Sequence, residues 1–164
     1  MPDTLVLGLG NPLVSDEGFG VQAVQRLTER YRFPDDVEVV DGGTLGLKLL
    51  PILEDADRIL VLDAVDVSRP PGTIVRIAWD EVHRALPVKI SPHQETVTEV
   101  LALFELRRGR PDEFLIIGCQ PASLEMGLEL SAEVEKGLEE ALEHVVKVLR
   151  NWGHPVVARN PVAP

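Results

Sequence analysis

The segment RILVLDAV, residues 58–65, is the most strongly apolar strand-length stretch of the chain and decides the class of fold. A near-continuous run of Leu, Ile and Val is typical of a strand that is buried on both faces of a sheet. Two further segments, TLVLGLG at 4–10 and EFLIIG at 113–118, have the same character. Strands of this kind belong to parallel sheets that helices cover on both sides, so an α/β fold is predicted.

The segments between these strands complete the predicted architecture. Shorter strands are expected at 37–40 and 73–77, and helices at 18–30, 45–53, 95–106 and from an N-cap at Ser131 to Gly153. Residues 80–94 are expected to be irregular, 121–130 are ambiguous, and the proline-containing tail from His154 is expected to fray. The prediction is one domain over 1–164, a three-layer α/β/α sandwich around a mostly parallel five-stranded sheet.

Composition narrows the class of function. The chain has 164 residues, with 16 basic and 27 acidic side chains and a net charge of −11. This charge argues against nucleic acid and against an anionic membrane surface as partners. A single cysteine, Cys119, fits a reducing compartment, and the N-terminus is a poor secretory signal, so a cytoplasmic location is expected. One core accounts for the amphipathic helix faces, so a monomer is expected.

Acidic residues and one histidine follow the expected strands. They are Asp16 and Glu17 after the first strand, Asp41 after the second, Asp63 at the end of the third, and His93 in the irregular stretch. In a parallel α/β sheet, ligands bind outside the carboxyl ends of the strands, so these five side chains are expected to converge there. Neighbouring carboxylates repel one another, and a divalent cation relieves that repulsion. Carboxylates with one imidazole suit nickel, zinc or iron(II) better than calcium.

Each of these residues also has a purely structural interpretation. Acids such as Asp16 and Glu17 stabilise helix starts, and Asp41 before two glycines fits a turn. A lone loop histidine such as His93 is usually a surface residue. Asp63 differs, because it interrupts a buried strand and its charge needs a partner. The other histidines are expected at the surface, and Cys119 is expected to be a small buried residue.

Taken together, the motifs resemble those of the maturation endopeptidases of nickel–iron hydrogenases. The resemblance rests on GLGNPLVSDEGFG at 8–20, DGGT at 41–44, Asp63, SPHQ at 91–94 and GCQPASLEMGLELS at 118–131. It covers nearly the whole chain in the right order, and it implies a phosphorylase/hydrolase-like α/β/α fold. Such enzymes remove a short C-terminal extension from the hydrogenase large-subunit precursor after nickel has been inserted.

The resemblance also implies roles for individual residues. The family's metal-contacting positions fall on Glu17, Asp63 and His93, and the nickel they contact is supplied by the precursor. Asp16 precedes the first of these positions, and Asp41 matches an acid that is expected to act in substrate recognition or catalysis. The expected catalytic set is therefore Asp16, Glu17, Asp41, Asp63 and His93.

Two alternatives stay open at this point. GLGNP also opens the peptidyl-tRNA hydrolases, but their T-R-H-N segment is replaced here by Ser15-Asp16-Glu17-Gly18, and the acidic charge opposes tRNA. The second alternative is a non-enzymatic metal- or nucleotide-binding module. Its nucleotide form is weakened because Leu13 stands where a dinucleotide fingerprint needs glycine.

Overall fold

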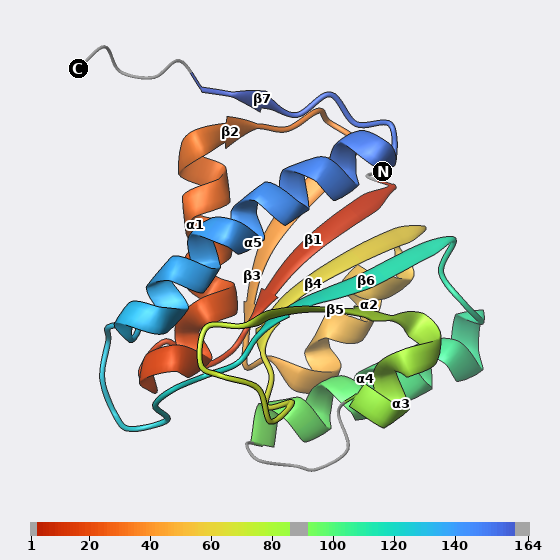
Figure 1. The fold of residues 1–164 in the computed structure, drawn as a ribbon. Helices are drawn as coiled ribbons and strands as arrows, with labels where there is room; N and C mark the ends of the chain where they lie inside the picture. Colours follow the sequence, from red (N-terminus) through yellow and green to blue (C-terminus); the bar gives the residue numbers. More distant parts are fainter. Residues whose placement is uncertain (1–2, 86–91, 160–164) are drawn as a thin grey trace.

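The computed structural model describes residues 3–85 and 92–159, without the side chains of residues 83, 85 and 92–96. A five-stranded sheet runs through the centre of the molecule in the order β3-β1-β4-β6-β5 (Figure 1). The strands are β1 (Thr4–Leu9), β3 (Val37–Gly43), β4 (Arg58–Ala64), β5 (Ile74–Ala78) and β6 (Glu113–Cys119). The first four in spatial order are parallel and β5 is antiparallel to β6, so the predicted mostly parallel sheet is confirmed.

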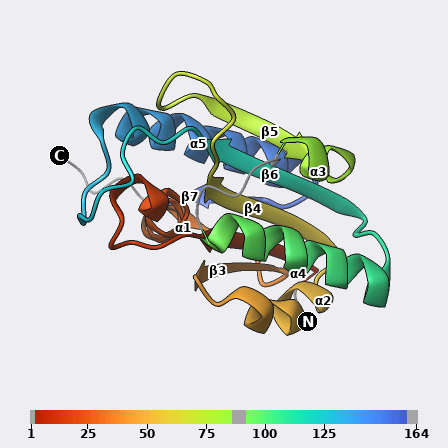
Figure 2. The same cartoon turned by 90° about the horizontal axis from the view of Figure 1, so that it is seen from below.

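Helices cover both faces of this sheet, as Figures 1 and 2 show. One face carries α1 (Phe19–Arg30) and α5 (Ala132–Asn151), and the other carries α2 (Leu50–Glu54), α3 (Val82–Ala85) and α4 (Pro92–Arg108). Short 3-10 helices η1 (Ser15–Gly18), η2 (Gly46–Leu49) and η3 (Trp79–Glu81) precede α1, α2 and α3. Each face has its own apolar core, and strand residues alternate between the two.

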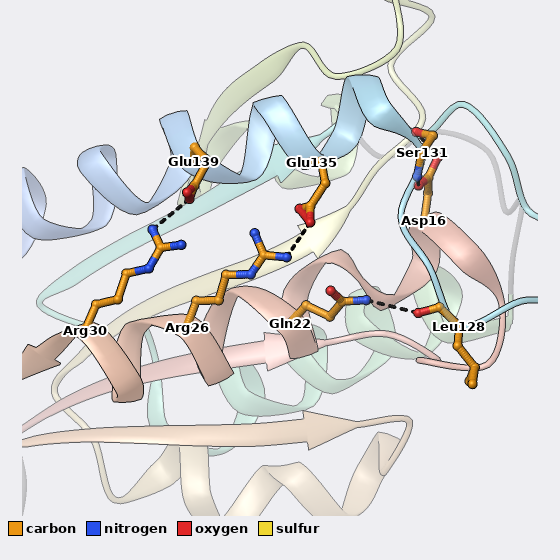
Figure 3. A network of polar contacts seen from close by, with 8 residues as sticks. All are labelled: Asp16, Gln22, Arg26, Arg30, Leu128, Ser131, Glu135 and Glu139. Atoms are coloured by element: carbon orange, nitrogen blue, oxygen red, sulfur yellow. Dashed lines mark hydrogen bonds and ion pairs between the residues drawn. The ribbon is translucent and has the colours of Figure 1, made fainter. Parts of the chain in front are cut away.

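The long helix α5 follows from its sequence. Its buried residues Val134, Leu138, Ala141, Leu142, Val145 and Leu149 form the predicted apolar stripe. The N-cap at Ser131 is confirmed, because its hydroxyl oxygen accepts a hydrogen bond from the Val134 amide at 3.3 Å. On its exposed side, α5 forms ion pairs with α1 that join Arg26 to Glu135 and Arg30 to Glu139 (Figure 3).

Two glycines let α1 lie directly on the sheet. A Cβ atom on Gly8 would lie 2.2 Å from the Gly20 carbonyl oxygen, and one on Gly20 would lie 2.2 Å from the Leu62 carbonyl oxygen. Only glycine at both positions permits this contact between backbones. The tight strand-to-helix turn predicted from the glycine-rich sequence is therefore confirmed, and it holds η1 against the ends of β1 and β4.

The element boundaries differ from the prediction in three places. β3 continues through Asp41-Gly42-Gly43, which were expected to close it, and the expected helix at 45–53 is divided into η2 and α2. The stretch at 80–94 is not irregular throughout, because it contains η3, α3 and the first turn of α4. Proline is readily accommodated in the first turn of a helix, so Pro92 begins α4 rather than excluding it.

The expected fraying after residue 153 is wrong as far as residue 159. His154 is 4% exposed, and its Nε2 lies 2.7 Å from the Thr4 hydroxyl oxygen and 3.6 Å from an Asp3 carboxylate oxygen. Its Nδ1 lies 3.5 Å from an Asp36 carboxylate oxygen. The next residues form β7 (Val157–Ala158), which pairs antiparallel with β2 (Tyr31–Arg32). This tie lies at the amino end of the sheet (Figure 1), opposite the edge considered below.

Within the two described ranges, none of the helices has the length and apolar character that a membrane crossing requires.

Candidate functional site at the carboxyl edge of the sheet

The turn between β1 and α1 places Glu17 at the carboxyl edge of the sheet. Gly10 begins this turn with φ +131°, and a Cβ atom there would lie 1.7 Å from the Glu17 carbonyl oxygen. Glycine is therefore required at position 10, and η1 folds back over the strand end. Glu17 is only 7% exposed, which is uncommon for a glutamate. It takes part in a polar or electrostatic interaction within the protein.

Asp63 lies on the neighbouring strand and is also buried, at 3% exposure. It pairs with Gly118 of β6, one residue before β4 ends. Val61 and Val65 on either side of it belong to the core beneath α2 and α4, so alternation directs Asp63 toward the same face. It has an interaction partner, as a charge in such a strand requires.

The first turn of α4 reaches this edge on the face to which Asp63 points. Val97 and Val100 of α4 line a small hollow together with Leu9 at the end of β1 and Gly43 at the end of β3. His93 lies one turn before Val97, so its backbone belongs to the part of α4 nearest the site. The prediction of a loop position for His93 is wrong, because this residue is helical. Its side chain lies outside the described part of the structure.

Asp41 lies at the same edge, on β3, but its environment is different. Its side chain is exposed, and its carboxylate accepts a hydrogen bond from the Gly43 amide at 3.0 Å. This local bond is the turn geometry that the two following glycines indicated. Asp41 therefore makes the turn contact that its purely structural interpretation predicted. Its participation in substrate recognition or catalysis stays a prediction.

Asp16 is fully buried and receives four hydrogen bonds from a distant part of the chain. Its Oδ2 accepts from the amides of Ala122 and Ser123 at 2.8 and 2.9 Å and from the Ser131 hydroxyl at 2.9 Å. Its Oδ1 accepts from the Ser131 amide at 2.7 Å. Asp16 therefore stabilises the start of α5 rather than the start of its own helix (Figure 3). This geometry gives it an anchoring role, and its place in the catalytic set stays a prediction.

The segment between β6 and α5, called here the clamped loop (residues 120–131), is held on η1 by further contacts. Gly127 pairs with Val14 as an isolated bridge, and the Ser15 hydroxyl donates to the Glu125 carbonyl at 2.6 Å. Ser15 has φ +40°, a conformation that costs a non-glycine residue roughly 1 kcal/mol or more. These bonds hold the 3-10 turn that carries Glu17 in one position.

Gln120, which sequence reasoning did not single out, braces the loop that follows Asp63. It is 7% exposed, and its Oε1 accepts from the Val67 amide at 2.8 Å and the Arg69 amide at 3.3 Å. Its Nε2 donates to Asp66 at 3.1 Å. Its position directly after β6 could have indicated this role, because a polar residue there lies at the carboxyl edge of the sheet.

Cys119 is fully buried, as expected. Burial raises the pKa of its thiol to about 12, and the negative charge of Asp16 adds to the effect. The protonated thiol is a poor nucleophile at neutral pH, so the geometry does not favour Cys119 as the attacking group.

The fold and this site define an α/β protein with buried acids at the carboxyl edge of a mostly parallel sheet. The family model described as HycI, hydrogenase maturation protease, matches residues 21–148. The chain belongs to the hydrogenase maturation protease family, whose members are peptide-bond hydrolases that act in hydrogenase maturation.

Individual relatives match along nearly the whole chain. The hydrogenase expression/formation protein HupD of Rhizobium leguminosarum bv. viciae is 42% identical, over 96% of this chain and 79% of its own length. The hydrogenase 2 maturation protease of Escherichia coli K12 is 38% identical, over 96% of this chain and 97% of its own. Among solved structures, the hydrogenase maturating endopeptidase HybD from E. coli superposes with a TM-score of 0.91, covering 97% of this chain and 98% of that one at 38% identity.

These matches confirm the family resemblance and the α/β fold. They support neither the peptidyl-tRNA hydrolase alternative nor the non-enzymatic module, because the matching relatives include named proteases and endopeptidases. The individual site residues and the nickel stay predictions at this stage.

Proposed function

We propose that the protein cleaves the C-terminal extension from the large-subunit precursor of a nickel–iron hydrogenase. Glu17, Asp63 and His93 contact the nickel that the precursor already carries, and the contact positions the scissile peptide bond. The observation that carries the proposal is the burial of two acids, Glu17 and Asp63, at one sheet edge beside the first turn of α4.

The donor types fit this substrate. Carboxylate and imidazole together suit a borderline divalent ion such as nickel, and three protein ligands leave room for groups of the precursor. Both carboxylates are also buried, and a buried carboxylate attracts a cation more strongly than one surrounded by water. Bound nickel could polarise a carbonyl group, whereas the residues of this chain bind the metal-bearing segment and orient it.

The surface around the site supports a protein substrate. Six large apolar side chains, called here the apolar rim, are exposed on the described segments that flank the edge: Leu13, Leu45, Leu47, Leu124, Met126 and Leu128. Met126 is 79% exposed and Leu128 70% exposed, and the clamped loop that carries them is bonded to Leu13 through the Gly127 amide. Exposed apolar groups gathered beside a site are typical of protein–protein contact.

The test is cleavage of purified precursor in nickel-loaded and nickel-free forms, followed by mass spectrometry of the released peptide. Glu17→Gln, Asp63→Asn and His93→Ala should each lower cleavage of the loaded form by about a hundredfold or more, because mispositioning alone can cost that much. Matched controls are Glu143→Gln and Asp35→Asn, which alter exposed acids, and His144→Ala on α5. The controls should cleave at the wild-type rate.

The nickel-free precursor tests the role of the metal separately. Wild-type protein should leave it intact, since the three ligands then have no ion to contact. Efficient cleavage of the nickel-free form would overturn recognition through nickel, and wild-type rates in all three site variants would overturn the residue assignment.

A further inference from the structure

A hollow of about 500 Å³ lies beside the site, along the edge strand β5. It begins at the loop that follows Asp63 and is lined by Asp66, Val67, Ser68, Arg69, Val75, Arg76, Ile77, Glu81 and Arg84. We call it the β5 groove. The loop 66–69 at one end of it follows the carboxyl end of β4 and starts three residues beyond Asp63.

The β5 groove carries uncompensated positive charge in a protein of net charge −11. Three of its residues, Arg69, Arg76 and Arg84, are exposed, and within the described part of the chain their guanidinium groups have no ion pair or hydrogen bond. By contrast, Arg26, Arg30, Arg107, Arg108 and Arg110 elsewhere on the surface are each paired with a carboxylate.

The two acids of the groove are engaged by other donors. Asp66 accepts from the Ser68 amide at 2.9 Å and from the Gln120 side chain at 3.1 Å. Glu81 accepts from the Ala78 amide at 3.1 Å, which closes the start of η3. The three guanidinium groups are therefore available to carboxylates that come from another molecule.

The backbone of β5 favours an extended partner. β5 is the end strand of the five-stranded sheet, so one row of its backbone amides and carbonyls faces away from β6. Three consecutive residues, Val75, Arg76 and Ile77, line the groove. Because successive side chains point to opposite faces, this lining places the groove at the strand edge, where an extended peptide can pair as a sixth strand.

We infer that the β5 groove binds an extended, carboxylate-bearing segment of the hydrogenase precursor next to the scissile bond, with Arg69, Arg76 and Arg84 as the carboxylate receptors. This inference rests on the proposed function. It assigns the three arginines to binding and positioning of the substrate, and the carboxylates are either acidic side chains of the segment or the terminal carboxyl group of the extension.

The experiment compares the triple variant Arg69→Gln/Arg76→Gln/Arg84→Gln with a control triple variant that removes the same charge elsewhere. The control substitutes Arg32, Lys136 and Lys147, which are exposed on β2 and α5, by glutamine. With nickel-loaded precursor, the groove variant should raise KM about tenfold, or 1.4 kcal/mol, with kcat unchanged. The control variant should retain the wild-type KM.

Binding is measured independently with a fluorescent synthetic peptide of the precursor's C-terminal extension. Wild-type affinity should fall as KCl rises from 50 to 300 mM, because exposed ion pairs are screened. One peptide has Asp and Glu replaced by Asn and Gln, and a second has an amidated C-terminus. The source of the carboxylates is the group whose removal abolishes the difference between the wild type and the groove variant.

Equal KM values for the groove and control variants, or a groove effect that survives both peptide changes, would overturn the inference. So would wild-type peptide affinity that does not change with salt. Failure of the proposed function is a different result, because the wild-type protein itself would then leave the loaded precursor uncleaved.

Discussion

The buried carboxylate of Asp16 allows a prediction whose size can be worked out from individual bonds. Asp16→Asn retains one acceptor oxygen, which can keep the three bonds now made by Oδ2. The amide nitrogen must then occupy the Oδ1 position and face the Ser131 amide, which is itself a donor. One charge-assisted bond, typically about 1.5–3 kcal/mol, is lost, and two buried donors oppose each other. We expect a loss of roughly 2–4 kcal/mol of unfolding free energy.

The assay is urea denaturation followed by circular dichroism, with Asp41→Asn as the control. Asp41 is exposed at the same sheet edge and accepts one local backbone bond, so its variant should lose less than about 1 kcal/mol. A change below about 0.5 kcal/mol in Asp16→Asn, or equal losses in the two variants, would refute the anchoring role.

Three further predictions concern other parts of the chain. The Cys119 thiol should resist alkylation in native protein at pH 8. Because folding raises the pKa of this thiol to about 12, the unfolded chain releases the proton first as the pH rises, and the stability advantage of wild type over Cys119→Ala should be constant below about pH 8 and lower by about 1.4 kcal/mol at pH 10, as measured by urea denaturation. His154→Ala should lower stability by about 2 kcal/mol or more and increase hydrogen exchange in β7, whereas His144→Ala on α5 should change stability by less than about 0.5 kcal/mol. Replacing Met126 and Leu128 by serine should raise KM for the precursor and leave the urea midpoint unchanged, because both side chains are exposed.

Most of the fold could be predicted from patterns of neighbouring residues in the sequence. The five strands follow from runs of apolar residues, and α5 follows from an apolar stripe and the Ser131 cap. The boundary errors arose where turn-forming residues serve as ordinary members of an element. Gly42 lies within β3, where the side chains of Leu7 and Leu9 occupy the space that a Cβ atom would need. Pro92 begins α4, because the first turn of a helix does not need the backbone N–H that proline lacks.

The errors about polar residues have a different origin, because their partners lie far away in sequence. Asp16 binds donors 106 to 115 residues further along the chain, and no periodicity near Asp16 reveals them. His154 is separated from its partner Thr4 by 150 residues, so nothing near it in the sequence indicated burial. The expectation of a surface position for His154 is therefore wrong. By contrast, Asp63 was identifiable because its signal is local, a charge inside a buried strand.

The placement of three of the predicted residues at the carboxyl edge follows from topology alone. Parallel strands bring their carboxyl ends together, so Glu17, Asp41 and Asp63 reach one edge whatever the details of their loops. The contacts that distinguish them were not predictable: Asp41 is exposed, whereas Glu17 and Asp63 are buried. The grouping of the three arginines in the β5 groove could not be predicted from the sequence, because they lie on a loop, a strand and a helix that come together only in the folded chain.

The measurement that bears most directly on the central claim is X-ray absorption at the nickel edge of loaded precursor, alone and in complex with this protein at a temperature where cleavage is slow. Wild-type protein should add oxygen and nitrogen ligands to the nickel, and a variant that combines Glu17→Gln, Asp63→Asn and His93→Ala should not. An unchanged nickel spectrum in a complex shown to be intact by gel filtration would contradict the claim.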